Sequence, residues 1–264
     1  MRSVLILPTK NPIIDENSKI SFCEKMINLI KYFKDKKMDI SIIDNQSNDL
    51  SKKTFNEFKE MLYIYSVDFG DNPSILDILR RNFEKGKFAT VRYGFNLFSD
   101  RDFIFFSDGD LSYLSDTSVI DRSLEILEKG DTKIVKGNRN TGGYNSKRSF
   151  SRKLITLARI YTLLLVTKVP DTQCGFFGFK NEPYIKRLYL YRNDEKEIQL
   201  KRLWSGLCGD WKFFSISEKL GYKIENIPIY HYNTGSASNI NLLRDIPVFI
   251  YEILNFLKSK GDYL

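Results

Sequence analysis

The chain has 264 residues, of which 42% are hydrophobic and 28% are charged. This composition excludes a disordered chain, and the length fits one folded domain with a sizeable core. The net charge is +8, which by itself favours an anionic partner such as nucleic acid or a membrane surface. The excess is local, however, because residues 132–170 hold nine basic and no acidic residues, which leaves 32 basic against 33 acidic residues elsewhere.

Three widely separated cysteines lack the paired spacing of a disulfide scaffold or a zinc site. The N-terminal segment MRSVLILPTKN has one Arg and a short apolar run that ends at Pro8, which is too little for a secretory signal. The longest apolar stretches, 154–166 and 246–257, are shorter than the roughly 20 residues that a membrane span needs. We therefore expect a cytoplasmic protein, for which the sequence allows peripheral association at the inner membrane face.

Short apolar runs and amphipathic segments alternate in the N-terminal half. In chain order we predict a strand at 4–7, a helix at 21–36, a strand at 40–43, a helix at 52–61, a strand at 62–67, a helix at 74–98 and a strand at 103–106. This alternation requires crossover connections, so it predicts a mostly parallel α/β sheet with helices on both faces. Ligands of such sheets bind beyond the carboxyl ends of the strands.

The pattern changes after residue 111. We predict a helix at 119–129, a strand at 134–136, a basic helix at 150–167, Gly-rich loops, a last strand at 223–229 and a closing amphipathic helix at 240–260. No internal repeat, low-complexity tract or linker divides the chain. We therefore expect a single domain over residues 1–264.

The segment FIFFSDGDLS places two carboxylates, Asp108 and Asp110, directly after a predicted strand. Two carboxylates at a ligand-binding edge repel each other unless a cation or protons intervene, and oxygen ligands suit Mg²⁺ or Mn²⁺, which bridge to phosphates. The alternative is a strand-ending turn built around Gly109. By themselves, these residues leave both interpretations open.

Two further segments carry weaker signals. Asp44 ends another predicted strand at the same edge, where a carboxylate can accept hydrogen bonds from a base or a ribose, and a solvated turn is the alternative. The segment NFEKGKFATVRYG places Gly86, Lys87 and Arg92 at the start or middle of a helix, which suits the counter-charging of a diphosphate. A solvated helix face is the alternative for these basic residues.

The order of these segments, PTKN, Asp44, NxxxGK with AxxxG and DGDLS, resembles glycosyltransferase family 2, the inverting GT-A class. The resemblance continues through IVKGNR, FSRKLITLARIYTLLL, DTQCGF, GDWKFFSISEKLGYKIENIPI and GSASNINLLRD. It is strongest to the dolichyl-phosphate and polyprenyl-phosphate hexosyltransferases, and DTQCGF leans toward the dolichyl-phosphate glucosyltransferase branch. The resemblance implies a GT-A fold with a nucleotide-sugar-binding part at 1–115 and an acceptor-binding part at 116–264, which ends in the amphipathic helix.

The resemblance also implies a set of site residues. The donor would be bound by Pro8, Thr9, Asn11, Asp44, Lys87, Asp108, Gly109 and Asp110. The acceptor would be bound by Arg139, Arg152, Thr156, Asp171 and Gln173. Arg152 and Thr156 are four residues apart, so they would share a helix face and suit a phosphate, although a solvated basic face is the alternative. The catalytic residues would be Asp110 and Asp210.

A divalent cation, Mg²⁺ or Mn²⁺, is the implied cofactor, with Asp108 and Asp110 as its ligands. Ser112 occupies a place where some relatives have a further ligand, and a hydroxyl is weaker than an amide or carboxylate. His231 is the one histidine of the chain. It is a candidate third ligand, and a structural role is the alternative.

We therefore expect inverting transfer of a hexose from a UDP-glucose-like donor to a polyprenyl phosphate at an anionic membrane surface. A phosphate acceptor is already anionic and needs no base. If the acceptor is instead a sugar hydroxyl of a polysaccharide or glycan, Asp210 would act as general base. The distant alternatives are a nucleotidyltransferase, which would release pyrophosphate, and a nucleic-acid binder that uses residues 132–170, although nucleic acid is not the expected partner.

Overall fold

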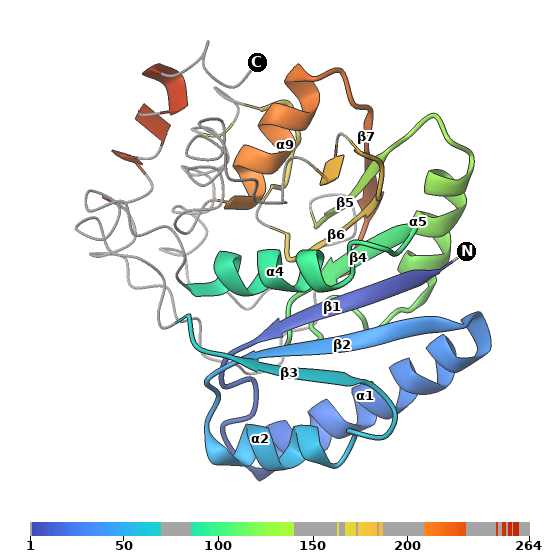
Figure 1. Ribbon diagram of the computed structural model, residues 1–264, viewed down its shortest axis with the longest axis vertical. Helices are drawn as coiled ribbons and strands as arrows, with labels where there is room; N and C mark the ends of the chain where they lie inside the picture. The colour runs from blue at the N-terminus through green and yellow to red at the C-terminus, as the bar shows by residue number, and fades with distance from the viewer. Residues whose placement is uncertain are drawn as a thin grey trace.

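Seven strands form one mixed sheet in the part of the chain that the computed structural model describes (Figure 1). That part comprises residues 2–69, 86–139, 163, 167–172, 174–183, 185–186, 209–230, 247, 250–251, 253–254 and 256–258, without the side chains of residues 88, 209 and 210. The strands are β1 (Ser3–Thr9), β2 (Met38–Asn45), β3 (Tyr63–Val67), β4 (Phe103–Ser107), β5 (Ile134–Asn138), β6 (Phe176–Lys180) and β7 (Ile224–Pro228). Their order across the sheet is β3-β2-β1-β4-β6-β5-β7.

The pairing of the strands confirms the mostly parallel sheet that the sequence predicts. Strand β1 is parallel to β2 and β4, β2 is parallel to β3, and β5 is parallel to β7. Strand β6 runs antiparallel to both of its neighbours, β4 and β5. The six predicted strands are present, but the prediction of Gly-rich loops before the last strand was wrong for β6, a short Phe-rich strand with Gly178 at its centre.

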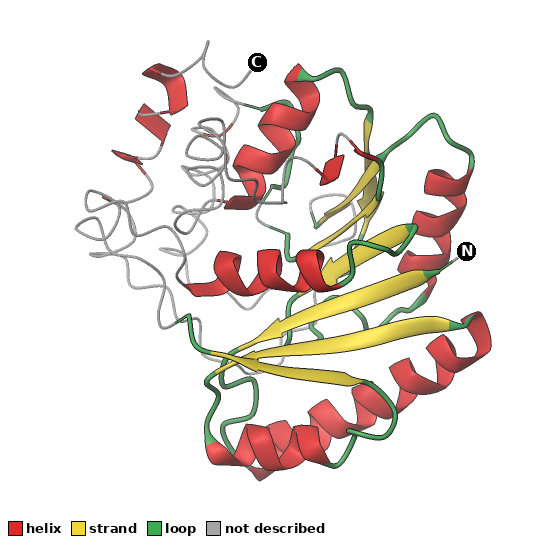
Figure 2. Ribbon diagram, in the orientation of Figure 1, coloured by secondary structure: helices red, strands yellow, loops and turns green. Residues whose placement is uncertain are grey.

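Helices cover both faces of the sheet, as predicted (Figure 2). Helices α4 (Gly86–Leu97) and α9 (Gly209–Lys219) lie on one face, where Phe95 and Trp211 pack in a cluster with Val4 of β1. Helices α1 (Glu16–Lys36), α2 (Asp49–Asn56) and α5 (Ser118–Glu128) lie on the other face, whose cluster includes Leu5 of β1. Successive residues of β1 therefore point into two separate cores, which is why the strand is apolar throughout.

Capping side chains set two helix starts that apolar periodicity placed too late. Helix α1 begins at Glu16, because Asp15 and Ser18 form a reciprocal capping box. Helix α2 begins at Asp49, because the side chain of Asn48 accepts a hydrogen bond from the backbone N–H of Ser51. The sequence analysis also missed α9, whereas α5 lies where it was predicted.

Much of the remaining predicted helix lies outside the described residues. This applies to the first part of the helix at 74–98, to most of the helix at 150–167 and to part of the closing helix at 240–260. The described residues of that closing segment are helical. Within the described ranges, no helix combines the length and the hydropathy that crossing a membrane requires.

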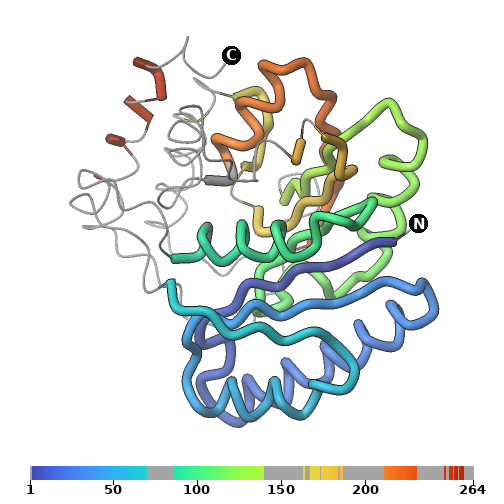
Figure 3. Tube along the Cα trace, in the orientation of Figure 1, coloured from blue at the N-terminus to red at the C-terminus, as the bar shows by residue number. Residues whose placement is uncertain are grey.

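Segments far apart in the sequence meet at one edge of the sheet, where β1, β2 and β4 end (Figure 3). Ser107, at the end of β4, pairs with Phe176, the first residue of β6. The antiparallel direction of β6 therefore brings the segment that precedes it to the carboxyl ends of the parallel strands. Strands β5 and β7 also end there, since Asn138 pairs with Pro228. We call this edge of the sheet the carboxyl edge.

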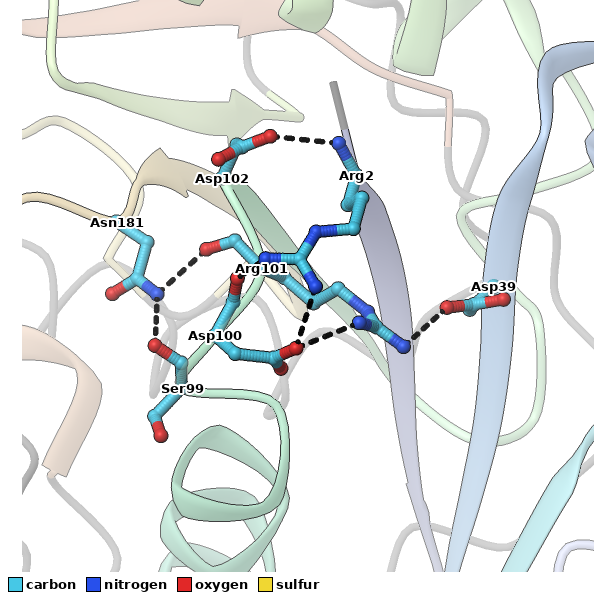
Figure 4. Close-up of polar contacts among 7 residues, drawn as sticks. All are labelled: Arg2, Asp39, Ser99, Asp100, Arg101, Asp102 and Asn181. Atoms are coloured by element: carbon cyan, nitrogen blue, oxygen red, sulfur yellow. Dashed lines mark hydrogen bonds and ion pairs between the residues drawn. The ribbon is translucent and has the colours of Figure 1, made fainter.

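The opposite edge is closed by polar contacts between the segments that flank four strands (Figure 4). Arg2, before β1, forms an ion pair of 2.9 Å with Asp100, and Arg101, before β4, forms one of 2.8 Å with Asp39 of β2. Asn181, after β6, donates a hydrogen bond of 2.7 Å to the backbone carbonyl of Arg101. These contacts connect the four adjacent strands β2, β1, β4 and β6 at the end of the sheet opposite the carboxyl edge.

Replacing Gly178 with Ala should lower the free energy of unfolding by about 1–3 kcal/mol, the usual cost of overpacking a core. A methyl group at this position would overlap the ring of Phe105 on the neighbouring strand β4. Chemical denaturation measures the change. Ser66→Ala, on the exposed side of edge strand β3, is the control and should change stability by no more than about 0.5 kcal/mol. Equal stability of the two variants would contradict the packing described for β6.

Candidate functional site

The segments after β1 and β2 are joined by hydrogen bonds at the carboxyl edge. The Thr9 hydroxyl donates to the Ile43 carbonyl at 3.4 Å, and the backbone N–H of Asn11 donates to the Ser47 hydroxyl at 2.9 Å. The Asn11 side-chain oxygen accepts from the backbone N–H of Asn48 at 2.6 Å. Asn11 has a left-handed backbone, with a φ of 49°, a conformation that Asn tolerates better than most residues. The role of Asn11 that the structure shows is therefore to connect the two loops.

Asp44 is a buried carboxylate at the end of β2, with 1% of its surface exposed. Its Oδ1 accepts a hydrogen bond of 3.1 Å from the backbone N–H of Ser47. Its Oδ2 is also buried and has no hydrogen-bond donor among the described residues. A buried acceptor without a donor is costly. A ligand N–H or O–H group at this oxygen would remove that cost.

Asp108, Gly109 and Asp110 form a tight turn directly after β4. The backbone N–H of Leu111 donates to the Asp108 carbonyl at 3.0 Å, and the backbone N–H of Ser112 donates to Asp110 Oδ1 at 3.0 Å. Leu111 has a left-handed backbone, with a φ of 57°. The turn that the sequence left as an alternative is therefore present, and it brings both carboxylates to the carboxyl edge.

Two glycines allow other segments to approach this turn closely. A Cβ atom on Gly109 would overlap the side chain of Thr9 and lie 2.6 Å from the Pro8 carbonyl oxygen. A Cβ atom on Gly175, just before β6, would overlap the carboxylate of Asp108. The Gly175 carbonyl also accepts a hydrogen bond of 2.9 Å from the backbone N–H of Asp108. The turn is thus held between the end of β1 and the start of β6.

Lys87 forms an ion pair with Asp108 from the first turn of α4. The backbone N–H of Gly86 donates to the carbonyl of Phe69, which follows β3, at 2.9 Å, so α4 begins at the carboxyl edge. Lys87 Nζ lies 2.5 Å from Asp108 Oδ1 and 5.5 Å from the centroid of the Phe106 ring. The Lys87 and Asp108 side chains are 43% and 28% exposed, so the pair is accessible to a ligand.

The two carboxylates of the turn fit a divalent cation that arrives with phosphate oxygens. Among the residues that the structure describes, no three His, Cys, Asp or Glu side chains form a group that could hold a metal. Mg²⁺ is typically held by one or two carboxylates together with substrate phosphates and water. Asp108 and Asp110 meet this requirement. Burial lowers the pKa of Lys25 in α1, and the negative charge of Asp110 opposes that shift.

Arg139, directly after β5, is bound to Asp171 in a buried ion pair. Its Nε lies 2.8 Å from Asp171 Oδ2 and its Nη2 lies 2.7 Å from Oδ1, and its backbone N–H also donates to Oδ2 at 3.0 Å. The Arg139 side chain is 9% exposed and that of Asp171 is 3% exposed. Burial by itself would raise the pKa of Asp171, but the hydrogen bonds and charge of Arg139 outweigh it and lower that pKa.

Two buried residues that the sequence analysis did not single out complete this region. The hydroxyl of Tyr113 accepts a hydrogen bond of 3.4 Å from Arg139 Nη1, and burial raises the pKa of that hydroxyl. The ammonium of Lys136, in the middle of β5, donates to the Cys174 carbonyl and lies 5.1 Å from the centroid of the Phe214 ring. A lysine inside an otherwise apolar strand was the available signal for Lys136. For Tyr113 the sequence offers none.

The structure brings most of the predicted donor residues together. The predicted residues at the carboxyl edge are Pro8, Thr9, Asn11, Asp44, Lys87, Asp108, Gly109, Asp110, Arg139 and Asp171. Arg152, Thr156, Gln173 and His231 lie outside the described residues. The backbone of Asp210 lies in the first turn of α9, but its side chain is not among those described. The predicted contact of Arg139 with an acceptor phosphate stays a prediction, since in the structure its guanidinium contacts Asp171.

Comparison with protein families gives one match. The model of the family described as "Glycosyl transferase family 2" matches residues 6–188. The matched segment includes the carboxyl-edge residues described above. The comparison with curated proteins gave no match.

The comparison with solved structures finds several that resemble this chain. Mannosyl-3-phosphoglycerate synthase from Rubrobacter xylanophilus is 13% identical, with a TM-score of 0.55, over 99% of this chain and 75% of that chain. The mannosyltransferase PcManGT from Pyrobaculum calidifontis, solved with GDP-Man and Mn²⁺, is 14% identical, with a TM-score of 0.47, over 86% of this chain and 55% of that chain. TarS residues 1–349 from S. aureus are 14% identical, with a TM-score of 0.43, over 86% and 58% of the two chains. The likeness to the first confirms the expected GT-A fold.

Replacing Asp171 with Asn should lower the free energy of unfolding at neutral pH by about 3–5 kcal/mol, because it removes the negative charge that lies against the buried Arg139 guanidinium. Chemical denaturation measures this loss. Asp100→Asn, which breaks half-exposed ion pairs at the opposite edge, is the control and should cost less than about 1 kcal/mol.

The pH dependence follows from the lowered pKa of Asp171. Its contribution to stability is fully present above the usual pKa of 3.8 and is lost as the pH falls through the lower value of the folded state. The stability difference between the parent protein and Asp171→Asn should therefore shrink only in strongly acidic solution. A difference that already vanished near neutral pH would show that the pair does not stabilise the fold.

Proposed function

The chain belongs to glycosyl transferase family 2, and from this premise we propose that it transfers a hexose from a UDP-glucose-like nucleotide sugar to a polyprenyl phosphate at the cytoplasmic face of a membrane. The proposal places the protein in the branch of the dolichyl-phosphate and polyprenyl-phosphate hexosyltransferases. It assigns donor binding to residues 1–115 and acceptor binding to residues 116–264. The reaction would be an in-line displacement at the anomeric carbon, with inversion and release of the nucleoside diphosphate.

The observation that carries the proposal is the buried Asp44 carboxylate, whose Oδ2 has no donor within the described part of the chain. A base N–H or a ribose hydroxyl is the kind of donor that this oxygen needs. Asp44 follows β2, so a nucleoside bound there would lie at the carboxyl edge. Pro8 and Thr9, at the end of the neighbouring strand β1, would line the same position.

The diphosphate would lie between the start of α4 and the turn after β4. Lys87 would contribute a positive charge, and the N-terminus of a twelve-residue helix favours anions. Asp108 and Asp110 would hold the divalent cation, Mg²⁺ or Mn²⁺, which supplies positive charge to the diphosphate when bound. Together these groups would stabilise the negative charge that develops on the leaving group.

The acceptor would lie beyond Arg139 and Asp171, on the side of β5 and β6. Arg139 is already engaged with Asp171, so we assign the main contacts with the acceptor phosphate to Arg152 and Thr156. Gln173 and His231 are proposed to complete the acceptor and metal sites. Lys136 and Arg139 are buried, so within 132–170 we assign attraction to an anionic membrane surface to the basic residues of 147–168, at roughly 1 kcal/mol for each Lys or Arg near it.

A two-stage experiment tests the proposal. Thermal-shift measurements with a panel of nucleotide sugars, with and without Mn²⁺, identify the donor, since a ligand at 100 times its Kd adds about 2.7 kcal/mol of stability. The labelled donor is then incubated with vesicles that contain polyprenyl phosphate. Label in the lipid extract and release of nucleoside diphosphate support the proposal. Label in a glycan would instead point to a hydroxyl acceptor with Asp210 as base, and release of pyrophosphate would point to nucleotidyl transfer.

Asp44→Asn should weaken binding of the nucleoside diphosphate by about 10- to 100-fold, the effect of losing one hydrogen bond to a charged group. Isothermal titration measures the change. Asp49→Asn is the matched control, because Asp49 is exposed and begins α2 only a few residues further on. Equal affinity of the two variants would remove Asp44 from the donor site.

Asp110→Asn should reduce transfer by at least about 100-fold, because the group that opposes leaving-group charge is lost. The thermal unfolding midpoint should stay close to that of the parent protein, since an Asn side-chain oxygen can still accept the hydrogen bond from the backbone N–H of Ser112. Release of nucleoside diphosphate is the assay. Full activity of this variant would contradict the assignment of Asp110 to the catalytic site.

A further inference from the structure

The carboxylate of Asp108 has two close neighbours, the backbone of Gly175 and the ammonium of Lys87. The backbone of Gly175 lies directly against the carboxylate, where a Cβ atom would overlap Oδ2 most and Oδ1 to a smaller extent. Oδ1 faces the ammonium of Lys87 at 2.5 Å. A cation that binds Oδ1 therefore competes with Lys87 for that oxygen.

The neighbour of Asp108 on one side is the rigid backbone of Gly175, and its neighbour on the other side is the flexible side chain of Lys87. Gly175 is held by its backbone, because its carbonyl accepts the hydrogen bond from the Asp108 N–H at 2.9 Å. The Lys87 side chain is 43% exposed, and a half-exposed ion pair contributes only about 0–1 kcal/mol. The long, flexible lysine side chain can move at small cost, whereas the glycine backbone cannot.

We propose that Lys87 is an exchangeable counter-ion, which neutralises Asp108 in the ligand-free protein and moves to the donor diphosphate when a divalent cation takes Asp108 Oδ1. The proposal rests on the proposed function, because it concerns the same donor site. It adds an order of events: the cation binds weakly to the free protein and tightly when the diphosphate is present to receive Lys87. Within the described residues no third His, Cys, Asp or Glu side chain joins Asp108 and Asp110, so the diphosphate would supply oxygens to the cation, which fits this order.

The test measures Mn²⁺ binding to the ligand-free protein from the electron paramagnetic resonance signal of free Mn²⁺. Lys87→Met removes both the competition for Oδ1 and the repulsion of the cation, so Mn²⁺ should bind about 3- to 10-fold more tightly. Lys87→Arg keeps the charge and should bind Mn²⁺ like the parent protein. Lys133→Met is the matched control, since Lys133 forms an ion pair of 2.6 Å with Glu182 at the opposite edge.

The second measurement is the affinity for UDP and for GDP by isothermal titration at saturating Mn²⁺. For whichever nucleotide the parent protein binds, Lys87→Met should weaken binding by about 10-fold, because one charge-assisted contact with the diphosphate is lost. Tighter Mn²⁺ binding together with weaker nucleotide binding supports the exchange. Mn²⁺ affinity that is unchanged or lower in Lys87→Met overturns it, and so does unchanged nucleotide affinity.

The outcome is distinguishable from failure of the proposed function. Transfer by the parent protein is assayed separately and does not depend on how Mn²⁺ affinity changes in Lys87→Met. If transfer is observed but the variant shows no gain in Mn²⁺ affinity, the exchange is wrong and the transferase assignment stands. If neither protein binds Mn²⁺ with or without nucleotide, the exchange and the proposed metal ligands are both wrong.

Discussion

The absence of a side chain at two glycines determines how closely the segments of the carboxyl edge can approach each other. Gly109 lets the turn after β4 rest on the end of β1, and Gly175 lets the segment before β6 rest on the Asp108 carboxylate. The pairing of Ser107 with Phe176 fixes the register of β4 and β6, and this register determines where both contacts lie along the strands. The position of Asp108 therefore depends on backbone geometry rather than on flexible side chains.

The carboxylates of this edge differ in what balances their charge. Two of them form ion pairs with a basic side chain from another element: Asp108 with Lys87, and Asp171 with Arg139. The charge of Asp110 partly offsets the lowering of the Lys25 pKa by burial. Asp44 differs, because its Oδ2 has no donor in the described part of the chain. A neutral ligand group can therefore donate a hydrogen bond to Asp44. An ion that binds one of the paired carboxylates has to compete with the basic side chain already bound there.

The sequence predicted the parts of the structure that depend on local pattern. Strands β1, β2 and β4 are largely apolar, and the polar residues at and after their carboxyl ends are the residues that meet at the carboxyl edge. Strand β6 was missed because it has five residues with Gly178 at its centre. Its place in the sheet depends on neighbours far away in the chain.

Contacts between distant segments were beyond the reach of local pattern. Tyr113 and Arg139 are 26 residues apart, and Lys136 and Cys174 are 38 residues apart. The burial of their polar groups depends on the antiparallel insertion of β6, which the sequence analysis missed. The pairing of Lys87 with Asp108 was not predicted either, because the two residues are 21 positions apart and each was assigned separately to the donor site.

The position of β6 between β4 and β5 has a consequence for how the chain can be divided. The boundary between the proposed donor and acceptor parts near residue 115 does not coincide with a boundary in the sheet, because β6 comes from the second part and pairs with β4 from the first. A fragment that ended there would leave β4 as an open, apolar edge, which is a template for aggregation. It would also lack the glycine backbone that covers Asp108 Oδ2. Chimaeras that exchange acceptor parts between relatives therefore need a crossover point that keeps β4, β6 and the segment before β6 from a single parent.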